Sequence, residues 1–226
     1  MTEMPAECAA LASLFPDCVR AACMRVQDAP LHIHDAELAF VKKAVEKRRR
    51  EFSAGRCCAR EALRQLGCNA GPIAQDHNGA PLWPEDIVGA ITHSSTYAAA
   101  AAARTSHLRG IGIDIETVSR VSAAIAGKIL TEPEKARLKH EADPHARQRL
   151  LALIFSAKEA VYKCLHPIAQ TRIGFEDACI ECDPSQSVIR IQLSARVRPV
   201  FHGLQSLPGR YCFFDDTVCA AVWLAA

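Results

Sequence analysis

Isoleucines alternate with glycines and acids near the middle of the chain, in the segment Gly110-Ile-Gly-Ile-Asp-Ile-Glu116. Alternation of this kind is the period of a β-strand, in which successive side chains point to opposite faces. The three isoleucines therefore predict a face that is buried in a core. The opposite face carries Asp114 and Glu116, with Cα atoms roughly 6.6 Å apart at the usual rise of a strand. The fold must accordingly bury one side of a central strand and place two neighbouring carboxylates on the other side.

Three other segments have the spacing of helices. Apolar residues recur at helical intervals over 36–66, and residues 52–55 are a point where this long helix is expected to be interrupted. A charged helix is predicted over 132–140. The strongest helical pattern covers 147–165, carries one continuous apolar stripe and is expected to end at Pro167.

Strands are expected over most of the remaining chain. Residues 1–34 have an irregular pattern with two weak helical patches, and 67–86 form an extended loop rich in glycine and proline. The six alanines in 97–103 favour a helix by propensity, whereas the place of this segment between two strands favours a buried strand, which we prefer. The other predicted strands are 87–92, 108–116, 178–182, 187–193, 209–214 and 218–224.

A short internal similarity suggests a repeated architecture. Phe52-Ser-Ala-Gly-Arg56 is similar to Phe155-Ser-Ala-Lys-Glu159, and each opens a helical stretch that is followed by strands. We therefore predict an α+β chain of two similar α/β halves, a pseudo-dimer within one chain. The halves are expected to span 1–106 and 107–226.

Composition argues against several classes of protein. The 226 residues carry a net charge of +2, which is too small for general nucleic-acid binding, although basic residues cluster over 42–64. No apolar run approaches the roughly 20 residues that span a bilayer, and the start of the chain lacks the pattern of a signal peptide. Eleven cysteines are scattered along the chain, and Cys179 and Cys182 form a lone C-x-x-C, so we expect reduced thiols and no zinc site. These features predict a soluble, cytoplasmic protein.

A third acid lies on the predicted helix over 147–165. Glu159 and Lys163 are four residues apart and therefore adjacent on one face. Taken alone, this pair is typical of a surface salt bridge, and two acids on a strand are typical of a polar surface. Two like charges side by side repel each other, however, and a cation would offset that repulsion. Because magnesium prefers oxygen ligands together with phosphate, Asp114, Glu116 and Glu159 predict a divalent metal beside a phosphate-bearing substrate.

The motifs resemble those of a known enzyme family. Gly112-Ile-Asp-Ile-Glu116 and Phe155-Ser-Ala-Lys-Glu-Ala-Val-Tyr-Lys163 together resemble the signature of 4′-phosphopantetheinyl transferases of the surfactin-synthetase-activating type. The resemblance covers roughly residues 40–182, with the motifs in the same order. Upstream segments are similar to the enterobactin synthetase component D branch, namely Arg48-Arg-Arg-Glu-Phe52, Arg56-Cys-Cys-Ala-Arg60, Gly79-Ala-Pro-Leu-Trp-Pro84 and Gly89-Ala-Ile-Thr-His-Ser94.

The resemblance implies a fold, a reaction and partners. Members of this type are monomers of two similar halves with coenzyme A bound between them. They move the 4′-phosphopantetheine arm of coenzyme A to a serine of an apo acyl carrier or peptidyl carrier protein and release adenosine 3′,5′-bisphosphate. Asp114, Glu116 and Glu159 would hold magnesium, or manganese in its place. Lys163 would neutralise the pyrophosphate and protonate the leaving group, and Lys158 would face the pantetheine or the phosphates. Either Glu159 or a metal-bound water would take the serine proton, so Asp114, Glu159 and Lys163 are the expected catalytic residues.

Residues of the first half match family positions that contact coenzyme A. Arg48, Arg56 and His93 would bind its phosphates, including the 3′-phosphate, because the planar fork of arginine pairs with two phosphate oxygens. Thr92 stands where serine is common and would offer its hydroxyl or backbone amide to a phosphate. Gln75 lies in a loop where relatives can carry a lysine near the nucleotide, so this chain departs from the family pattern there.

Two other functions stay open at this point. A carrier-protein binding module that has lost catalysis would not need the acids and the lysine that this chain retains. A hydrolase that cleaves the pyrophosphate of coenzyme A would be expected to show a P-loop, a nucleophile elbow or a paired-metal motif, none of which occurs. Among carriers, the motifs are compatible with the peptide synthetases of siderophore biosynthesis and with the carriers of fatty-acid synthesis.

Overall fold

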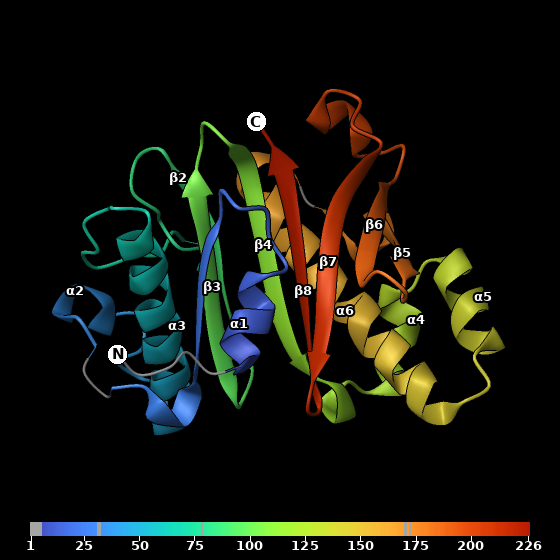
Figure 1. The fold of residues 1–226 in the computed structure, drawn as a ribbon, viewed down its shortest axis with the longest axis horizontal. Helices are drawn as coiled ribbons and strands as arrows, with labels where there is room; N and C mark the ends of the chain where they lie inside the picture. The colour runs from blue at the N-terminus through green and yellow to red at the C-terminus, as the bar shows by residue number, and fades with distance from the viewer. Residues whose placement is uncertain (1–5, 31–32, 78, 170, 172) are drawn as a thin grey trace.

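The computed structural model describes residues 6–30, 33–77, 79–169, 171 and 173–226 (Figure 1). Its strands form one antiparallel sheet of three strands, in the order β1-β3-β2, and another of five strands, in the order β4-β8-β7-β6-β5. One long helix packs on each sheet, so the predicted α+β class is confirmed.

The three-stranded sheet consists of β1 (Arg20–Arg25), β2 (Ile87–His93) and β3 (Tyr97–Arg104). Helix α3 (Glu46–Gln65) packs on one face and α1 (Ala6–Ala12) on the other. The alanines of β3 are buried on both faces, because only small side chains let the two helices approach from either side. The strand that we preferred for 97–103 is confirmed, whereas β1 lies in a segment that was predicted to be irregular.

The five-stranded sheet confirms the strands predicted for the second half, with ends that differ by a few residues. Helix α6 (Pro144–Ala169) packs across two of these strands and buries its apolar stripe there. The helix continues through Pro167, so this proline does not end it as predicted. The strands are β4 (Leu108–Thr117), β5 (Ala178–Asp183), β6 (Val188–Leu193), β7 (Ser206–Phe214) and β8 (Thr217–Ala225).

Strand β4 lies where the two halves adjoin. Its isoleucines share a core with alanines of β3 on the α1 side of the sheets, as their alternation predicted. On the opposite face the backbone of α6 comes close, and a Cβ on Gly112 would lie 1.8 Å from the carbonyl oxygen of Ala160. Strand β2 of the first half runs beside β4, which brings Thr92 next to Asp114. The two halves therefore meet at the face that carries the predicted carboxylates.

The helix predicted over 36–66 is wrong in two respects: it is broken between Leu38 and Glu46, and residues 52–55, where the interruption was expected, lie inside the continuous helix α3. Helix α2 (Asp35–Leu38) is separated from α3 by turns, because the chain folds back so that Glu37 pairs with Arg60 of α3 at 2.9 Å. The loop over 67–86 is confirmed where it is described, with one isolated bridge between Gln75 and Pro81, while residue 78 lies outside the described residues. None of the described helices is long and apolar enough to cross a membrane.

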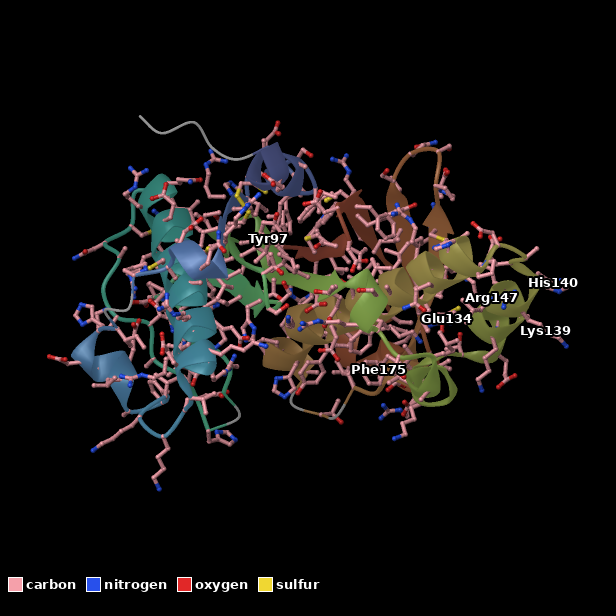
Figure 2. All side chains as sticks on the ribbon, turned by 90° about the horizontal axis from the view of Figure 1, so that it is seen from below. Tyr97, Glu134, Lys139, His140, Arg147 and Phe175 are labelled. Atoms are coloured by element: carbon pink, nitrogen blue, oxygen red, sulfur yellow. A yellow bond between two sulfur atoms is a disulfide. The ribbon has the colours of Figure 1, made fainter. Side chains whose placement is uncertain are left out.

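Short helices complete the second half. Helix α5 (Glu132–His140) has the predicted bounds, and its Lys139 and His140 side chains point away from the body of the protein (Figure 2). Proline in its first turn and a capping box formed by Thr131 and Glu134 explain why it begins there. The other short helices described in this half are α4 (Ala126–Ile129), η2 (Val118–Arg120), η3 (Ala123–Ile125), η4 (Phe175–Asp177) and η5 (Arg198–Phe201), while η1 (Val26–Asp28) lies in the first half.

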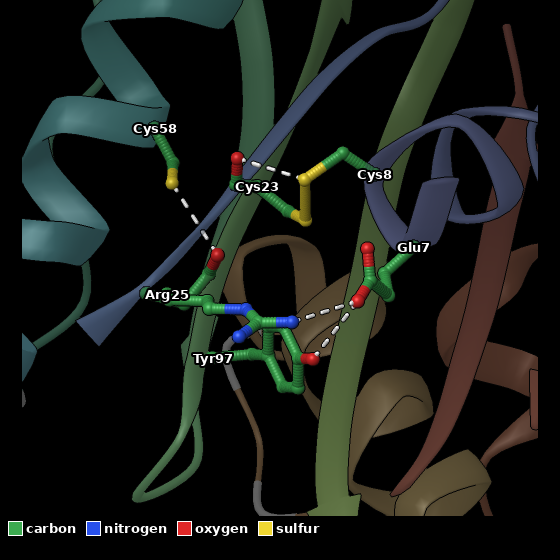
Figure 3. Close-up of a disulfide and its surroundings, with 7 residues drawn as sticks. Glu7, Cys8, Cys23, Arg25, Cys58 and Tyr97 are labelled. Atoms are coloured by element: carbon green, nitrogen blue, oxygen red, sulfur yellow. Dashed lines mark hydrogen bonds and ion pairs between the residues drawn. A yellow bond between two sulfur atoms is a disulfide. The ribbon is translucent and has the colours of Figure 1, made fainter. Parts of the chain in front are cut away.

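A disulfide joins Cys8 of α1 to Cys23 of β1, which corrects the expectation that every thiol is reduced (Figure 3). The two cysteines face each other because α1 packs on β1. Beside them, Glu7 accepts hydrogen bonds from the Arg25 guanidinium at 3.1 Å and from the Tyr97 hydroxyl at 3.3 Å. The other nine cysteines are free thiols.

Candidate active site

Three side chains from three elements meet where the halves adjoin. Lys163 of α6 donates to the Asp114 carboxylate of β4 at 2.6 Å and to the Thr92 hydroxyl of β2 at 3.1 Å. The Thr92 hydroxyl also donates to the same carboxylate oxygen at 3.1 Å. Thr92 and Asp114 are almost fully buried, and charges interact more strongly away from water. The structure thus brings three of the predicted site residues into direct contact.

Two further acids, Glu116 and Glu159, lie near this cluster. Burial and then the charge of Asp114 raise the pKa of Glu116 to about 7. The same two causes raise the pKa of Glu159, while Lys163 lowers both values. Neither glutamate accepts a hydrogen bond from the described residues. The Oδ2 atom of Asp114 is buried and also has no partner among them.

These carboxylates suit a divalent cation by their donor chemistry. A cation could bind the unpartnered oxygen of Asp114 and relieve the repulsion that raises the two glutamate pKa values. As the side chains stand, no three acidic, histidine or cysteine side chains of the described chain converge on one point. One oxygen of Asp114 is instead paired with Lys163. Magnesium binding by Asp114, Glu116 and Glu159 therefore stays a prediction, with which the donor chemistry of these residues is compatible.

The raised pKa of Glu116 should affect stability. In the unfolded chain Glu116 loses its proton near its ordinary pKa of 4.5, whereas the folded protein keeps the proton up to about 7. The folded state binds the additional proton between these values, so its stability falls as pH rises through that window. We expect the melting temperature to fall more from about pH 5 to about pH 8 in the wild type than in Glu116→Gln. Magnesium should raise the melting temperature of the wild type more at about pH 8 than at about pH 5. Melting curves with and without magnesium test this, and parallel pH profiles of the two proteins would contradict it.

A second polar cluster lies between α3 and β2. Arg48 contacts the Nε2 atom of His93. Glu51 lies 3.6 Å from the Arg48 guanidinium and 3.7 Å from the Nδ1 atom of His93. Burial and then the Arg48 charge lower the pKa of His93, so the neutral imidazole accepts a hydrogen bond from the arginine. Glu51 was not predicted as a site residue, and its helical spacing from Arg48 was the available signal.

Arg56 lies deeper along the same helix. It is 3% exposed, pairs with Glu37 at 3.9 Å and places its guanidinium over the ring of Phe52. Its Nε and Nη2 atoms are buried and form no hydrogen bond with the described residues, because the 3.9 Å between Nε and Glu37 is too long for one. Arg56 therefore retains donors for an additional acceptor, such as a phosphate oxygen.

Lys158 does not face the Asp114–Lys163 cluster. Consecutive residues of a helix are turned by about 100°, so Lys158 lies on the buried side of α6. Its ammonium group donates to the carbonyl oxygens of Ile129 at 2.6 Å and Phe175 at 2.8 Å. It also lies 2.8 Å from the Glu134 carboxylate. Its three donors are all used within the protein, and Lys158 is also among the residues that line a pocket of about 460 Å³. The contact of Lys158 with the pantetheine or the phosphates stays a prediction.

A pocket of about 720 Å³ lies between the halves beside Lys163. Its walls are residues 76–77 and 79–83, strand β2, the start of β4 and the last turns of α6. A second pocket of about 460 Å³ has mixed walls, with charged residues such as Lys158 and Glu176 beside apolar ones such as Ile173 and Phe175. Glu159 and Tyr162 line both pockets, so Glu159 lies between two spaces that a bound molecule could fill. Tyr162 was not predicted, because an exposed tyrosine on a helix has no distinctive spacing.

Comparisons with known proteins match both halves of the chain. Residues 36–103 match the family model described as the 4′-phosphopantetheinyl transferase N-terminal domain. Residues 110–222 match the model described as the 4′-phosphopantetheinyl transferase superfamily. The second match alone covers half of the chain.

Similar proteins come from several bacteria. The 4′-phosphopantetheinyl transferase Npt of Nocardia iowensis is 40% identical over 150 residues, which are 66% of this chain and 66% of that protein, just under two thirds of its length. The 4′-phosphopantetheinyl transferase Svp of Streptomyces mobaraensis is 33% identical over 84% of this chain and 78% of that protein. Enterobactin synthase component D of Escherichia coli K12 is 37% identical over 67% of this chain and 70% of that protein.

Proposed function

This chain belongs to the 4′-phosphopantetheinyl transferase superfamily, and we propose that it transfers the 4′-phosphopantetheine arm of coenzyme A to a serine of an apo carrier protein, with release of adenosine 3′,5′-bisphosphate. The motif resemblance to this family is confirmed by the matches. One observation carries the proposal. Lys163 joins Thr92 of the first half to Asp114 of the second half beside the pocket between them.

The two halves have different tasks in this proposal. Residues 1–106 bind the phosphates of the nucleotide through Arg48, Arg56, Thr92 and His93, which is supported by the unpartnered donors of Arg56. Residues 107–226 hold the metal and the reacting groups. Coenzyme A lies in the pocket between the halves, and the protein acts as a cytoplasmic monomer.

The reaction is an in-line displacement at phosphorus. The serine oxygen bonds to the phosphorus on the pantetheine side, and the bond from that phosphorus to the oxygen on the adenosine side breaks. Glu159 takes the serine proton, and its raised pKa makes it a better base. Lys163 neutralises and protonates the leaving oxygen, while Asp114 holds its ammonium group in place at 2.6 Å.

A magnesium ion bound by Asp114, Glu116 and Glu159 would supply positive charge beside the pyrophosphate oxygens. The residues around the site orient coenzyme A and the carrier serine on either side of Glu159. The retained acids and the contact of Asp114 with Lys163 favour transfer over a catalytically inactive binding module.

Nucleotide release distinguishes transfer from hydrolysis. With coenzyme A, magnesium and an apo carrier, we expect one adenosine 3′,5′-bisphosphate for each modified serine, and none without the carrier. Chromatography of the nucleotides over a range of carrier concentrations measures this ratio, with an acyl carrier and a peptidyl carrier in separate reactions. Release without any carrier would show a hydrolase. Binding of coenzyme A without release in any reaction would show a binding module.

The arginine cluster should determine affinity for the 3′-phosphate. Arg48→Ala removes a charged donor, so we expect the dissociation constant of coenzyme A to rise about tenfold or more. Dephospho-coenzyme A lacks the 3′-phosphate, and its affinity should change little. Titration calorimetry with both ligands measures the difference, and Arg50→Ala is a control because Arg50 on the same helix pairs with Glu46 at the surface. Equal losses for the two ligands would contradict the assignment.

A further inference from the structure

Lys158 and Glu134 form a buried ion pair behind Glu159. Their side chains are 1% and 0% exposed, and the ammonium nitrogen lies 2.8 Å from the carboxylate. Glu134 belongs to α5 and Lys158 to α6, while Phe175 lies in the segment that leads to β5 (Figure 2 labels Glu134 and Phe175). A charge pair without access to water is retained only where its other hydrogen-bonding groups are satisfied.

The pair is fully satisfied by backbone groups of other elements. Lys158 donates to the Ile129 carbonyl at the end of α4 and to the Phe175 carbonyl of η4. Glu134 accepts from the backbone N–H groups of Thr131 and Ile180, each at 2.7 Å. Two side chains thus connect α6 with α4, α5, η4 and β5.

These connections end at the wall of the second pocket. Phe175 lines that pocket, and so does Lys128, which precedes the Ile129 carbonyl that Lys158 holds. Lys158 and Glu159, which are consecutive in the helix, line the same pocket. A shift of α6 against η4 or α4 would therefore move Glu159 relative to both the pocket wall and Asp114.

We propose that the Glu134–Lys158 pair is a positioning device, which holds the helix turn that carries Glu159 and so sets the direction of the Glu159 carboxylate toward the Asp114–Lys163 cluster. The expected effect of this pair on kcat rests on the proposed function, whereas its effect on the position of Glu159 does not. Lys158 acts through Glu159 and touches no substrate. If Lys158 instead bound a phosphate, it would have to leave three partners and strand the buried Glu134 carboxylate.

Three variants test the device. Lys158→Met and Glu134→Gln each break the pair, and the double variant removes both charges, so it leaves no lone buried charge if a single variant folds poorly. Lys135→Met is the control, because Lys135 is an exposed lysine on α5 that pairs with Glu132 at the surface. Thermal unfolding of each variant checks that it is folded.

Three readouts separate positioning from substrate contact. We expect kcat to fall about 100-fold in both single variants and the double variant, as for a misplaced reacting group. The affinity of the coenzyme A-bound protein for Mn²⁺, measured by electron paramagnetic resonance, should fall about tenfold, as it does when a group that orients a metal ligand is removed. The dissociation constant of coenzyme A should stay within about threefold of the wild type, because no contact with the nucleotide is lost.

Each outcome gives a decision. Weaker coenzyme A binding in Lys158→Met but not in Glu134→Gln would overturn the proposal in favour of a phosphate contact. Folded variants with wild-type kcat and Mn²⁺ affinity would also overturn it. A wild type that modifies no carrier would refute the proposed function alone, and the Mn²⁺ affinities would still decide whether the pair positions Glu159.

Discussion

Asp114→Ala should abolish transfer while the protein stays folded. The substitution removes the partner that holds the Lys163 ammonium group at 2.6 Å, and with it the unpartnered oxygen available to a metal. Groups that offset charge in a transition state contribute large factors, so we expect kcat to fall by about 1,000-fold or more. Initial rates of carrier modification under saturating coenzyme A and magnesium measure the loss.

Two further variants control this result. Asp114→Asn keeps an acceptor for Thr92 but not the charge, so it should lose nearly as much activity as the alanine variant. Asp183→Ala removes an aspartate of β5 whose carboxylate accepts hydrogen bonds from Ser185 in the next turn, and its rate should equal that of the wild type. Activity of Asp114→Ala above about one tenth of the wild type would remove Asp114 from the catalytic machinery.

Gly112→Ala should have the largest effect on stability. Its Cβ would lie 1.8 Å from the carbonyl oxygen and 2.6 Å from the carbonyl carbon of Ala160. Both are backbone atoms in the middle of α6, so no side-chain rotation relieves the clash and the whole helix must move off β4. Overpacked cores lose 1–3 kcal/mol in ordinary cases, and we expect a loss of more than about 3 kcal/mol in the free energy of unfolding.

Gly127→Ala is the matched control for this prediction. Gly127 lies in the short helix α4, and a Cβ there meets no atom within 4 Å. Alanine is the better helix former, so this variant should be as stable as the wild type or up to about 1 kcal/mol more stable. Urea unfolding of the three proteins measures the differences. Equal stability of Gly112→Ala and the wild type would show that α6 does not pack on β4 as described.

Strong local patterns explain what the sequence predicted well. The alternation of β4 and the apolar stripe of α6 each depend on a core that buries one face, and both elements occur where expected. Strand β1 was missed because its residues, Arg20–Arg25, do not alternate, and pairing with β3 is what makes them a strand. The break between α2 and α3 was missed because it depends on the long-range pairing of Glu37.

Local patterns also separate the site residues that could be predicted from those that could not. Asp114 and Lys163 were predictable because a strand period and a helix period each determine which face a side chain occupies. The partner of Lys158 was not predicted, because one step along a helix from Glu159 turns the side chain to another face, where Lys158 pairs with Glu134. Glu134 has no local signal, since its partners come from α6 and β5.

Intact-mass spectrometry of an apo carrier protein tests the central claim most directly. After incubation with the wild-type protein, coenzyme A and magnesium, the carrier should gain the mass of one phosphopantetheine group. A carrier whose acceptor serine is replaced by alanine should keep its apo mass. If both an acyl and a peptidyl apo carrier keep their apo mass with the wild-type protein, while coenzyme A stays intact, the account of this chain as a phosphopantetheinyl transferase is contradicted.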